Sequence, residues 1–195
     1  MSDDATLLRQ SIDLCSKWTV LPLVAGCVAS VAAAPGEAGA FGAALFALTL
    51  AIAIIDWKLL LIPNWLNALV LVLGLAQAAA LANDGLRWEA AAEALARGAT
   101  LGAVLLAVRA IYAKARGREG LGLGDVKLAG AGGLWVGWAM LPVIVEIATL
   151  SALAVFLIAP RLAGRPARWN ARLPFGSFLA PAIWATWLIE TWLSA

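Results

Sequence analysis

The sequence predicts an all-α polytopic membrane protein with about seven transmembrane helices, within a range of roughly six to eight, and a cytoplasmic N-terminus. Of its 195 residues, 63% are hydrophobic and only 13% are charged, and the mean hydropathy is +0.90. Soluble domains are much more polar than this. The apolar residues also form runs of about 15 to 20, close to the length of helix that crosses a bilayer core.

The N-terminal segment, residues 1–17, predicts a short interfacial helix ahead of the membrane domain. Its apolar residues Leu8, Ile12 and Cys15 recur at helical spacing among charged neighbours. The first apolar run after it ends in three alanines, as a secretory signal does before its cleavage site. The leading region is long and acidic, however, and a proline follows the alanines, which favours a retained first span. Residues 18–195 are therefore expected to form one transmembrane domain.

Turn and start signals divide the apolar runs into separate spans. Pro63 marks the start of the third span, and Asn83-Asp84-Gly85 is a turn signal after its end. An amphipathic stretch, residues 86–96, precedes the fourth span, and the fifth is rich in small residues that let helices pack closely. The expected spans are residues 18–34, 39–55, 65–81, 98–112, 126–140, 142–159 and 174–193.

The positions of lysine and arginine predict the orientation, because these residues are enriched in cytoplasmic loops. With the N-terminus inside, all of the 14 lysines and arginines except Arg87 and Arg97 fall on the cytoplasmic side. Two spans separate Asp56, at the end of the second span, from Asp125, at the start of the fifth. Both aspartates are therefore expected at the cytoplasmic face, where they can meet.

The stretch from Gly120 to Lys127 reads GLGLGDVK and places Asp125 behind three alternating glycines. A carboxylate at the edge of an apolar helix is costly unless it is hydrated, paired or used. The glycines are expected to allow a positive φ and the close approach of an extended peptide. Taken alone, the stretch fits equally well an ordinary loop-to-helix boundary that Asp125 caps.

The residue types that are absent or rare exclude several kinds of chemistry. The sequence has no histidine, and its two cysteines, Cys15 and Cys27, are too far apart for a zinc clip. Serine–histidine and cysteine–histidine nucleophile pairs are thereby excluded, and no metal or cofactor is expected. The net charge is only +2, and the positive residues lie beside apolar segments, which indicates topology signals rather than a nucleic-acid surface.

Two neighbouring aspartates can supply both an acid and a base. Because like charges repel, both cannot ionise cheaply, and the pair shares one proton. The ionised carboxylate can then draw a proton from an attacking water while the protonated one donates to the developing oxyanion. Lys58 and Lys127, each two residues from an aspartate, could favour the ionised form, or could act only as interfacial topology charges.

Three motifs in order carry a family resemblance. They are Asp56 followed by Ile62-Pro63-Asn64, then Gly122-Leu123-Gly124-Asp125-Val126-Lys127, then Leu173-Pro174-Phe175-Gly176-Ser177-Phe178-Leu179. From about residue 40 onward the chain resembles the type IV prepilin peptidase family, the leader peptidases of the GxGD aspartic protease class. The resemblance implies that Asp56 and Asp125 are the catalytic residues and that Gly122 and Gly124 form the loop that admits substrate. It implies structural or substrate-loop support from Lys127, Pro63, Asn64, Pro174, Phe175 and Gly176.

The resemblance also implies a function, namely removal of the basic leader from type IV prepilins or pseudopilins. The expected location is the cytoplasmic membrane of a prokaryote, with the active site facing the cytoplasm. Longer family members carry an N-terminal domain with paired cysteine motifs and also methylate the new N-terminus. Because this chain has only two cysteines, a compact, peptidase-only member is expected. The alternative function is a transporter or an assembly scaffold that uses the aspartates as a proton or cation site.

Overall fold

The computed structural model describes residues 20–34, 36–82, 85–118, 120–162 and 173–194. Within these ranges the chain forms helices and turns and no strand, which confirms the predicted all-α class. The predicted interfacial segment, residues 1–17, lies outside the described residues, as does most of the basic loop expected between the last two spans.

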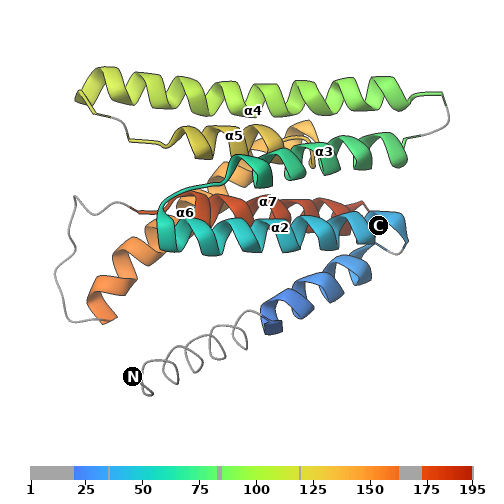
Figure 1. Cartoon of the computed structure of the whole chain (residues 1–195), viewed down its shortest axis with the longest axis horizontal. Helices are drawn as coiled ribbons and strands as arrows, with labels where there is room; N and C mark the ends of the chain where they lie inside the picture. The colour runs from blue at the N-terminus through green and yellow to red at the C-terminus, as the bar shows by residue number, and fades with distance from the viewer. Residues whose placement is uncertain (1–19, 35, 83–84, 119, 163–172, 195) are drawn as a thin grey trace, which may run out of the picture.

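The helices form a bundle in which one short helix is central. Figure 1 shows α5 between α4 and α7, with α2 running alongside α7, and these neighbours are in contact. At one end of the bundle, on the left of Figure 1, α2 ends and α5 and α7 begin. The elements are a first helix (Val20–Ala33), α2 (Glu37–Leu59), α3 (Asn64–Ala80), α4 (Arg87–Arg116), α5 (Leu123–Gly132), the 3-10 turn η1 (Trp138–Met140), α6 (Leu141–Leu162) and α7 (Gly176–Leu193).

Three helices of the described chain are long and apolar enough to cross a membrane by length and composition: α2, α4 and the segment Trp138–Ile158. The first helix and α3 are also apolar but shorter. Large apolar side chains such as Val108 and Leu150 are exposed on the outer surface of the bundle, as lipid-facing residues would be. These features agree with the predicted membrane protein, while the number of seven spans stays a prediction.

The helix α4 differs from its prediction because it is continuous. The sequence suggested an amphipathic stretch at 86–96 and a separate span at 98–112, but a single helix covers both. Gly98 lies inside this helix and does not interrupt it. A Cβ atom at Gly98 would clash with the Leu134 side chain and lie 2.5 Å from the Gly130 carbonyl oxygen. Gly98 therefore serves the close packing of α4 on α5. The helix ends at Gly117, which has φ of +66°.

The prediction of a continuous fifth span over residues 126–140 was wrong. The helix α5 has only 10 residues, and an irregular segment, residues 133–137, follows it. Trp135 Nε1 donates to the Val70 carbonyl oxygen at 3.0 Å, and the Gly137 N–H donates to the Glu190 carboxylate at 2.9 Å. Non-helical backbone at membrane depth is stable only where it is buried in protein. The apolar pattern here therefore reflects burial inside the bundle rather than contact with lipid.

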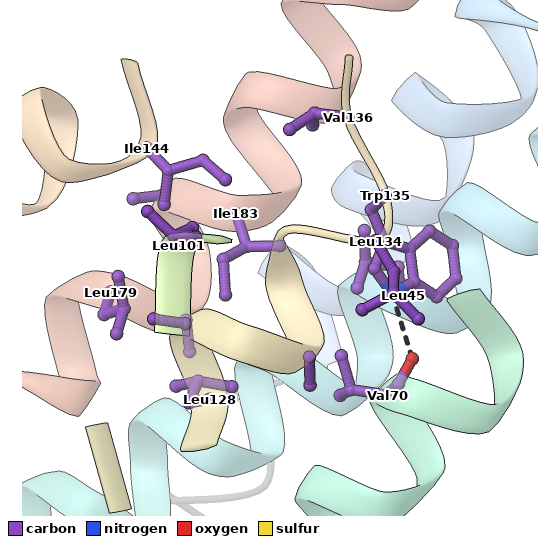
Figure 2. Packing of buried hydrophobic residues seen from close by; sticks show 14 of the residues in the cluster. Leu45, Val70, Leu101, Leu128, Leu134, Trp135, Val136, Ile144, Leu179 and Ile183 are labelled. Carbon is purple, nitrogen blue, oxygen red and sulfur yellow. Dashed lines mark hydrogen bonds between the residues drawn. The ribbon is translucent and has the colours of Figure 1, made fainter. Parts of the chain in front are cut away.

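The hydrophobic core gathers around α5 and the irregular segment. Trp135 is buried there, as expected from a packing role, and Figure 2 shows its hydrogen bond to Val70. Because α5 is enclosed by α3, α4 and α7, its N-terminal turn has a fixed position. The core side chains labelled in Figure 2 are Leu45, Val70, Leu101, Leu128, Leu134, Trp135, Val136, Ile144, Leu179 and Ile183.

Candidate functional site

Asp56 lies in the last turn of α2, and only 5% of its surface is exposed. The helix ends shortly after it. Its last helical hydrogen bond is donated by the Leu60 N–H to the Asp56 carbonyl oxygen at 2.9 Å, and Leu60 then adopts a left-handed conformation with φ of 52°. A non-glycine residue in this region costs about 1 kcal/mol. After this left-handed turn the chain runs to Pro63, the N-cap of α3.

Asp125 lies in the first turn of α5 and is 8% exposed. The Gly122 N–H donates to Asp125 Oδ2 at 3.2 Å, so the side chain caps the start of its own helix. Burial chiefly, and the charge of Asp56 in addition, raise the pKa of Asp125 to about 6, and the Gly122 hydrogen bond opposes this rise.

The glycines before Asp125 serve close packing and not a positive φ. The described glycines with positive φ are Gly36, Gly85 and Gly117, so the expectation of a positive φ in the GLGLGD stretch was wrong. A Cβ atom at Gly120 would lie 2.5 Å from the Tyr112 ring, and one at Gly124 would lie 3.3 Å from Ile62 Cβ. At Gly120 and Gly124 the close contacts are therefore with the protein's own side chains, Tyr112 and Ile62.

The structure brings the Asp56 and Asp125 carboxylates together at the start of α7. A Cβ atom at Gly176 would lie 2.9 Å from Asp56 Oδ2 and 3.0 Å from Asp125 Oδ1. The two oxygens are therefore no further apart than the sum of these distances, about 6 Å. Gly176 is the predicted supporting residue at which an added Cβ atom would crowd both carboxylates, so only a residue without a side chain fits there.

Ser177 is a site residue that the sequence did not single out. Its backbone N–H donates to Asp56 Oδ2 at 2.8 Å, and its Oγ lies 3.2 Å from the same oxygen and 3.0 Å from the Ala53 carbonyl oxygen. The N-terminus of α7 thus faces the Asp56 carboxylate, an arrangement that stabilises negative charge. The sequence signals were its membership of the third motif, in which it was given no role, and its place in the first turn of a helix, where N–H groups lack partners within the helix.

Ile62 is a second residue that sequence reasoning passed over. Its side chain is buried, and a Cβ atom at Gly176 would lie 2.5 Å from Ile62 Cδ1. Together with its contact at Gly124, this places Ile62 between the starts of α5 and α7 as an apolar wall of the site. Ile62 belongs to the first motif, but an isoleucine in an apolar sequence gave no sign of this role.

The other predicted supports lie at helix starts around the aspartates. The Pro63 carbonyl oxygen accepts the N–H groups of Leu66 and Asn67, and the Pro174 and Phe175 carbonyl oxygens accept N–H groups of the first turn of α7. These residues begin helices, as the sequence analysis expected of Pro63.

Lys127 and Asn64 form an exposed pair beside the site. Lys127 Nζ donates to Asn64 Oδ1 at 3.0 Å, so the hydrogen bond of this lysine is to an amide and not to a catalytic candidate. Among the described residues, no group of three or more histidine, cysteine, aspartate or glutamate side chains could hold a metal ion. The expectation of a site without metal or cofactor stays a prediction.

Comparison with known proteins gives a family match that includes both aspartates. The family model described as the type IV leader peptidase family matches residues 43–157. The prepilin leader peptidase/N-methyltransferase of Burkholderia pseudomallei (strain 1026b) is 41% identical over 100 residues, which cover 49% of this chain and 32% of the relative. No solved structure matches the chain.

Two further relatives match different lengths of the chain. The prepilin leader peptidase/N-methyltransferase of Pectobacterium carotovorum subsp. carotovorum is 35% identical over 162 residues, covering 83% of this chain and 55% of the relative. Leader peptidase HopD of Salmonella typhimurium is 45% identical over 65 residues, covering 33% of this chain and 41% of the relative. The matched part of the chain thus spans about a third to a half of the length of these curated relatives.

Proposed function

Because the chain belongs to the type IV leader peptidase family, we propose that it is a membrane-embedded aspartic endopeptidase. Its substrates are type IV prepilins or pseudopilins, from which it removes the basic leader. The observation that carries the proposal is the approach of the Asp56 and Asp125 carboxylates to one point at Gly176. Two carboxylates brought this near to one point can act on one water molecule.

The surroundings of the two carboxylates assign them different roles. Asp56 Oδ2 accepts the Ser177 N–H and faces the N-terminus of α7, so a hydrogen-bond donor and the positive end of the helix dipole lie against this oxygen. Asp125 has a pKa raised to about 6, so its protonated form persists to higher pH than that of an ordinary aspartate. Asp56 is therefore the general base and Asp125 the general acid.

The reaction follows from these roles. Asp56 takes a proton from water as the water oxygen bonds to the carbonyl carbon of the scissile peptide, and Asp125 gives its proton to the carbonyl oxygen. When the tetrahedral intermediate collapses, the C–N bond breaks and the proton held by Asp56 passes to the leaving nitrogen. The carbonyl oxygen returns its proton to Asp125, and the pair is restored with one shared proton.

The site is proposed to face the cytoplasm from the cytoplasmic membrane of a prokaryote. The unequal distribution of lysine and arginine supports this orientation. Near the site, Trp57 and Trp65 are 56% and 63% exposed, as expected of side chains at a membrane–water interface. A prepilin that presents its leader to the cytoplasm and its apolar helix to the bilayer would reach both parts of such a site.

The test is cleavage of a prepilin-type substrate in membranes by the wild type, Asp56→Asn and Asp125→Asn at matched expression. Each variant should lose at least about a hundredfold in rate while remaining folded, because it removes the base or the acid. The matched control is Glu146→Gln, which neutralises an exposed carboxylate on α6 and should cleave normally. Normal cleavage by either aspartate variant would refute the roles assigned. A wild type that cleaves no such substrate would favour the scaffold or transport alternative.

A further inference from the structure

A groove with a volume of about 530 Å³ opens between α3, α4 and α5. Its lining is mostly apolar and rich in small residues, among them Ala68, Gly98, Gly102 and Gly130. A Cβ atom at Gly102 would lie 3.4 Å from Gly130 Cα, so the two helices approach closely along this seam. Small residues of this kind let a further helix pack against a groove in a membrane.

One end of the groove adjoins the two aspartates. Val126 and Lys127, which line it, directly follow Asp125 in α5. Asn64, the first residue of α3, lines the same end and accepts the hydrogen bond from Lys127. From there the groove runs along α3, α4 and α5, away from the catalytic end of the bundle. A segment lying in it would therefore begin beside the catalytic carboxylates.

Asn67 is the feature that points to a ligand. It lines the groove, is only 6% exposed, and neither its Nδ2 nor its Oδ1 has a hydrogen-bond partner within the described chain. Burying a donor and an acceptor without partners costs free energy, and hydrocarbon offers no water to reduce that cost. Both polar atoms are closed to water-sized contact from the groove, so a molecule that occupies the groove supplies the missing partner when the Asn67 side chain turns toward it.

The chemistry of Asn67 selects among possible occupants. A lipid acyl chain fills an apolar groove but offers no hydrogen bond. A helix satisfies its own backbone groups, so only one of its side chains could pair with Asn67. We propose that the groove binds the apolar helix of the substrate and that one hydrogen-bonding side chain of this helix pairs with Asn67. This inference rests on the proposed peptidase function and names the surface that holds the substrate.

The position of Asn67 predicts where the polar side chain lies. Asn67 is three residues into α3 from Asn64, which corresponds to about 4.5 Å along the helix axis. The leader must reach Asp56 and Asp125, so the N-terminal end of the substrate helix lies at the aspartate end of the groove. The polar side chain therefore falls within roughly the first two turns after the cleaved bond.

The first test fills the groove without changing the catalytic residues. Ala103 is exposed and lines the groove, whereas its neighbour Val104 is exposed and does not. The substrate is a synthetic peptide with a basic leader and an apolar helix that carries one glutamine in its second turn. Ala103→Phe should raise the apparent KM about tenfold with kcat nearly unchanged, and Val104→Phe should match the wild type. An unchanged KM for Ala103→Phe would overturn the proposal.

The second test separates recognition by Asn67 from a structural role. Asn67→Leu is compared with the wild type on the glutamine substrate and on a matched substrate with leucine at that position. The substitution should raise the apparent KM about fivefold for the glutamine substrate and leave it unchanged or lower for the leucine substrate. An equal effect on both substrates would mean that Asn67 acts on folding and would overturn the proposal.

The third test identifies the occupant directly. A photoreactive residue replaces Ala99, which lines the groove, in the inactive Asp125→Asn variant, and should crosslink to the substrate helix. Crosslinks only to lipid, or only to a second copy of the chain, would overturn the groove proposal. If the wild type still cleaved the substrate, the peptidase function would stand. A wild type that cleaves neither substrate would instead refute the peptidase function, and the groove proposal with it.

Discussion

The backbone N–H of Ser177 donates to Asp56 Oδ2 at 2.8 Å, although the two residues are 121 positions apart in the sequence. This bond joins the first turn of α7 to the last turn of α2. The position of α7 along its axis therefore decides how the Asp56 carboxylate is oriented and how well its negative charge is stabilised.

Removing the Ser177 hydroxyl should disturb the position of the proposed general base. Ser177→Ala keeps the N–H donor and deletes the Oγ that lies 3.2 Å from Asp56 Oδ2. We expect kcat to fall about tenfold, because a hydrogen bond to a charged group is worth roughly 1.5–3 kcal/mol. The measurement is kcat in liposomes at the pH of maximal rate.

The control for this prediction is Ser151→Ala on α6, which deletes another half-buried hydroxyl that donates to a backbone carbonyl. It should leave kcat unchanged. An equal kcat for Ser177→Ala and the wild type would contradict the role given to the Ser177 hydroxyl.

The rate should fall as pH rises through the pKa of Asp125. Burial and the Asp56 charge raise this pKa to about 6, so the protonated acid is present below pH 6 and is lost above it. Well above that value, kcat/KM should fall about tenfold per pH unit, because one proton is required. The measurement is kcat/KM between pH 4 and 9 in liposomes. A rate that increases steadily from pH 6 to pH 9 would contradict the role of Asp125 as the acid.

The irregular segment after α5 should contribute to stability through Trp135. Trp135→Phe keeps most of the buried ring but removes the Nε1 donor to the Val70 carbonyl oxygen. We expect a loss of about 1 kcal/mol in unfolding free energy, seen as a lower thermal midpoint in detergent. Trp138→Phe removes an exposed hydrogen bond to Glu93 and should change the midpoint little. Equal midpoints for the two variants would contradict the structural role given to Trp135.

The sequence could predict the all-α class and the shared face of the two aspartates. Hydropathy indicates membrane helices, and the basic loops place Asp56 and Asp125 on one side because two spans lie between them. It could not predict where α5 ends, since hydropathy does not distinguish contact with lipid from burial inside the bundle. Residues 133–137 are apolar for the second reason, and their irregular backbone is held by Val70 and Glu190.

The missed site residues share a physical cause. Ser177 and Ile62 act through contacts with residues far away in the chain, and their own types, a serine at a helix start and an apolar isoleucine, are common in any membrane protein. The error about the GLGLGD glycines is of the same kind. A position can require glycine because of its backbone conformation or because a neighbour leaves no room for a side chain. Only the positions of Ile62 and Tyr112 show that the second reason applies at Gly124 and Gly120.

The tightest packing at the site gives the most specific prediction. In Gly176→Ala the added Cβ would lie 2.9 Å from Asp56 Oδ2, 3.0 Å from Asp125 Oδ1 and 2.5 Å from Ile62 Cδ1. At least one carboxylate or the start of α7 must move, and a displacement of about 1 Å at a catalytic group can cost a hundredfold in rate. We therefore expect a loss of this order in kcat, measured on enzyme with unchanged expression and thermal midpoint.

A second substitution tests whether this loss comes from crowding. Ile62→Val deletes Cδ1, the atom closest to the added methyl group, and alone should leave kcat within about twofold of the wild type because it removes one methylene. Combined with Gly176→Ala, it should restore part of the rate, since α7 can then approach without displacing the carboxylates. If the double variant is no faster than Gly176→Ala alone, the contact with Ile62 does not limit the site, and the clash with the two carboxylates must account for the whole loss.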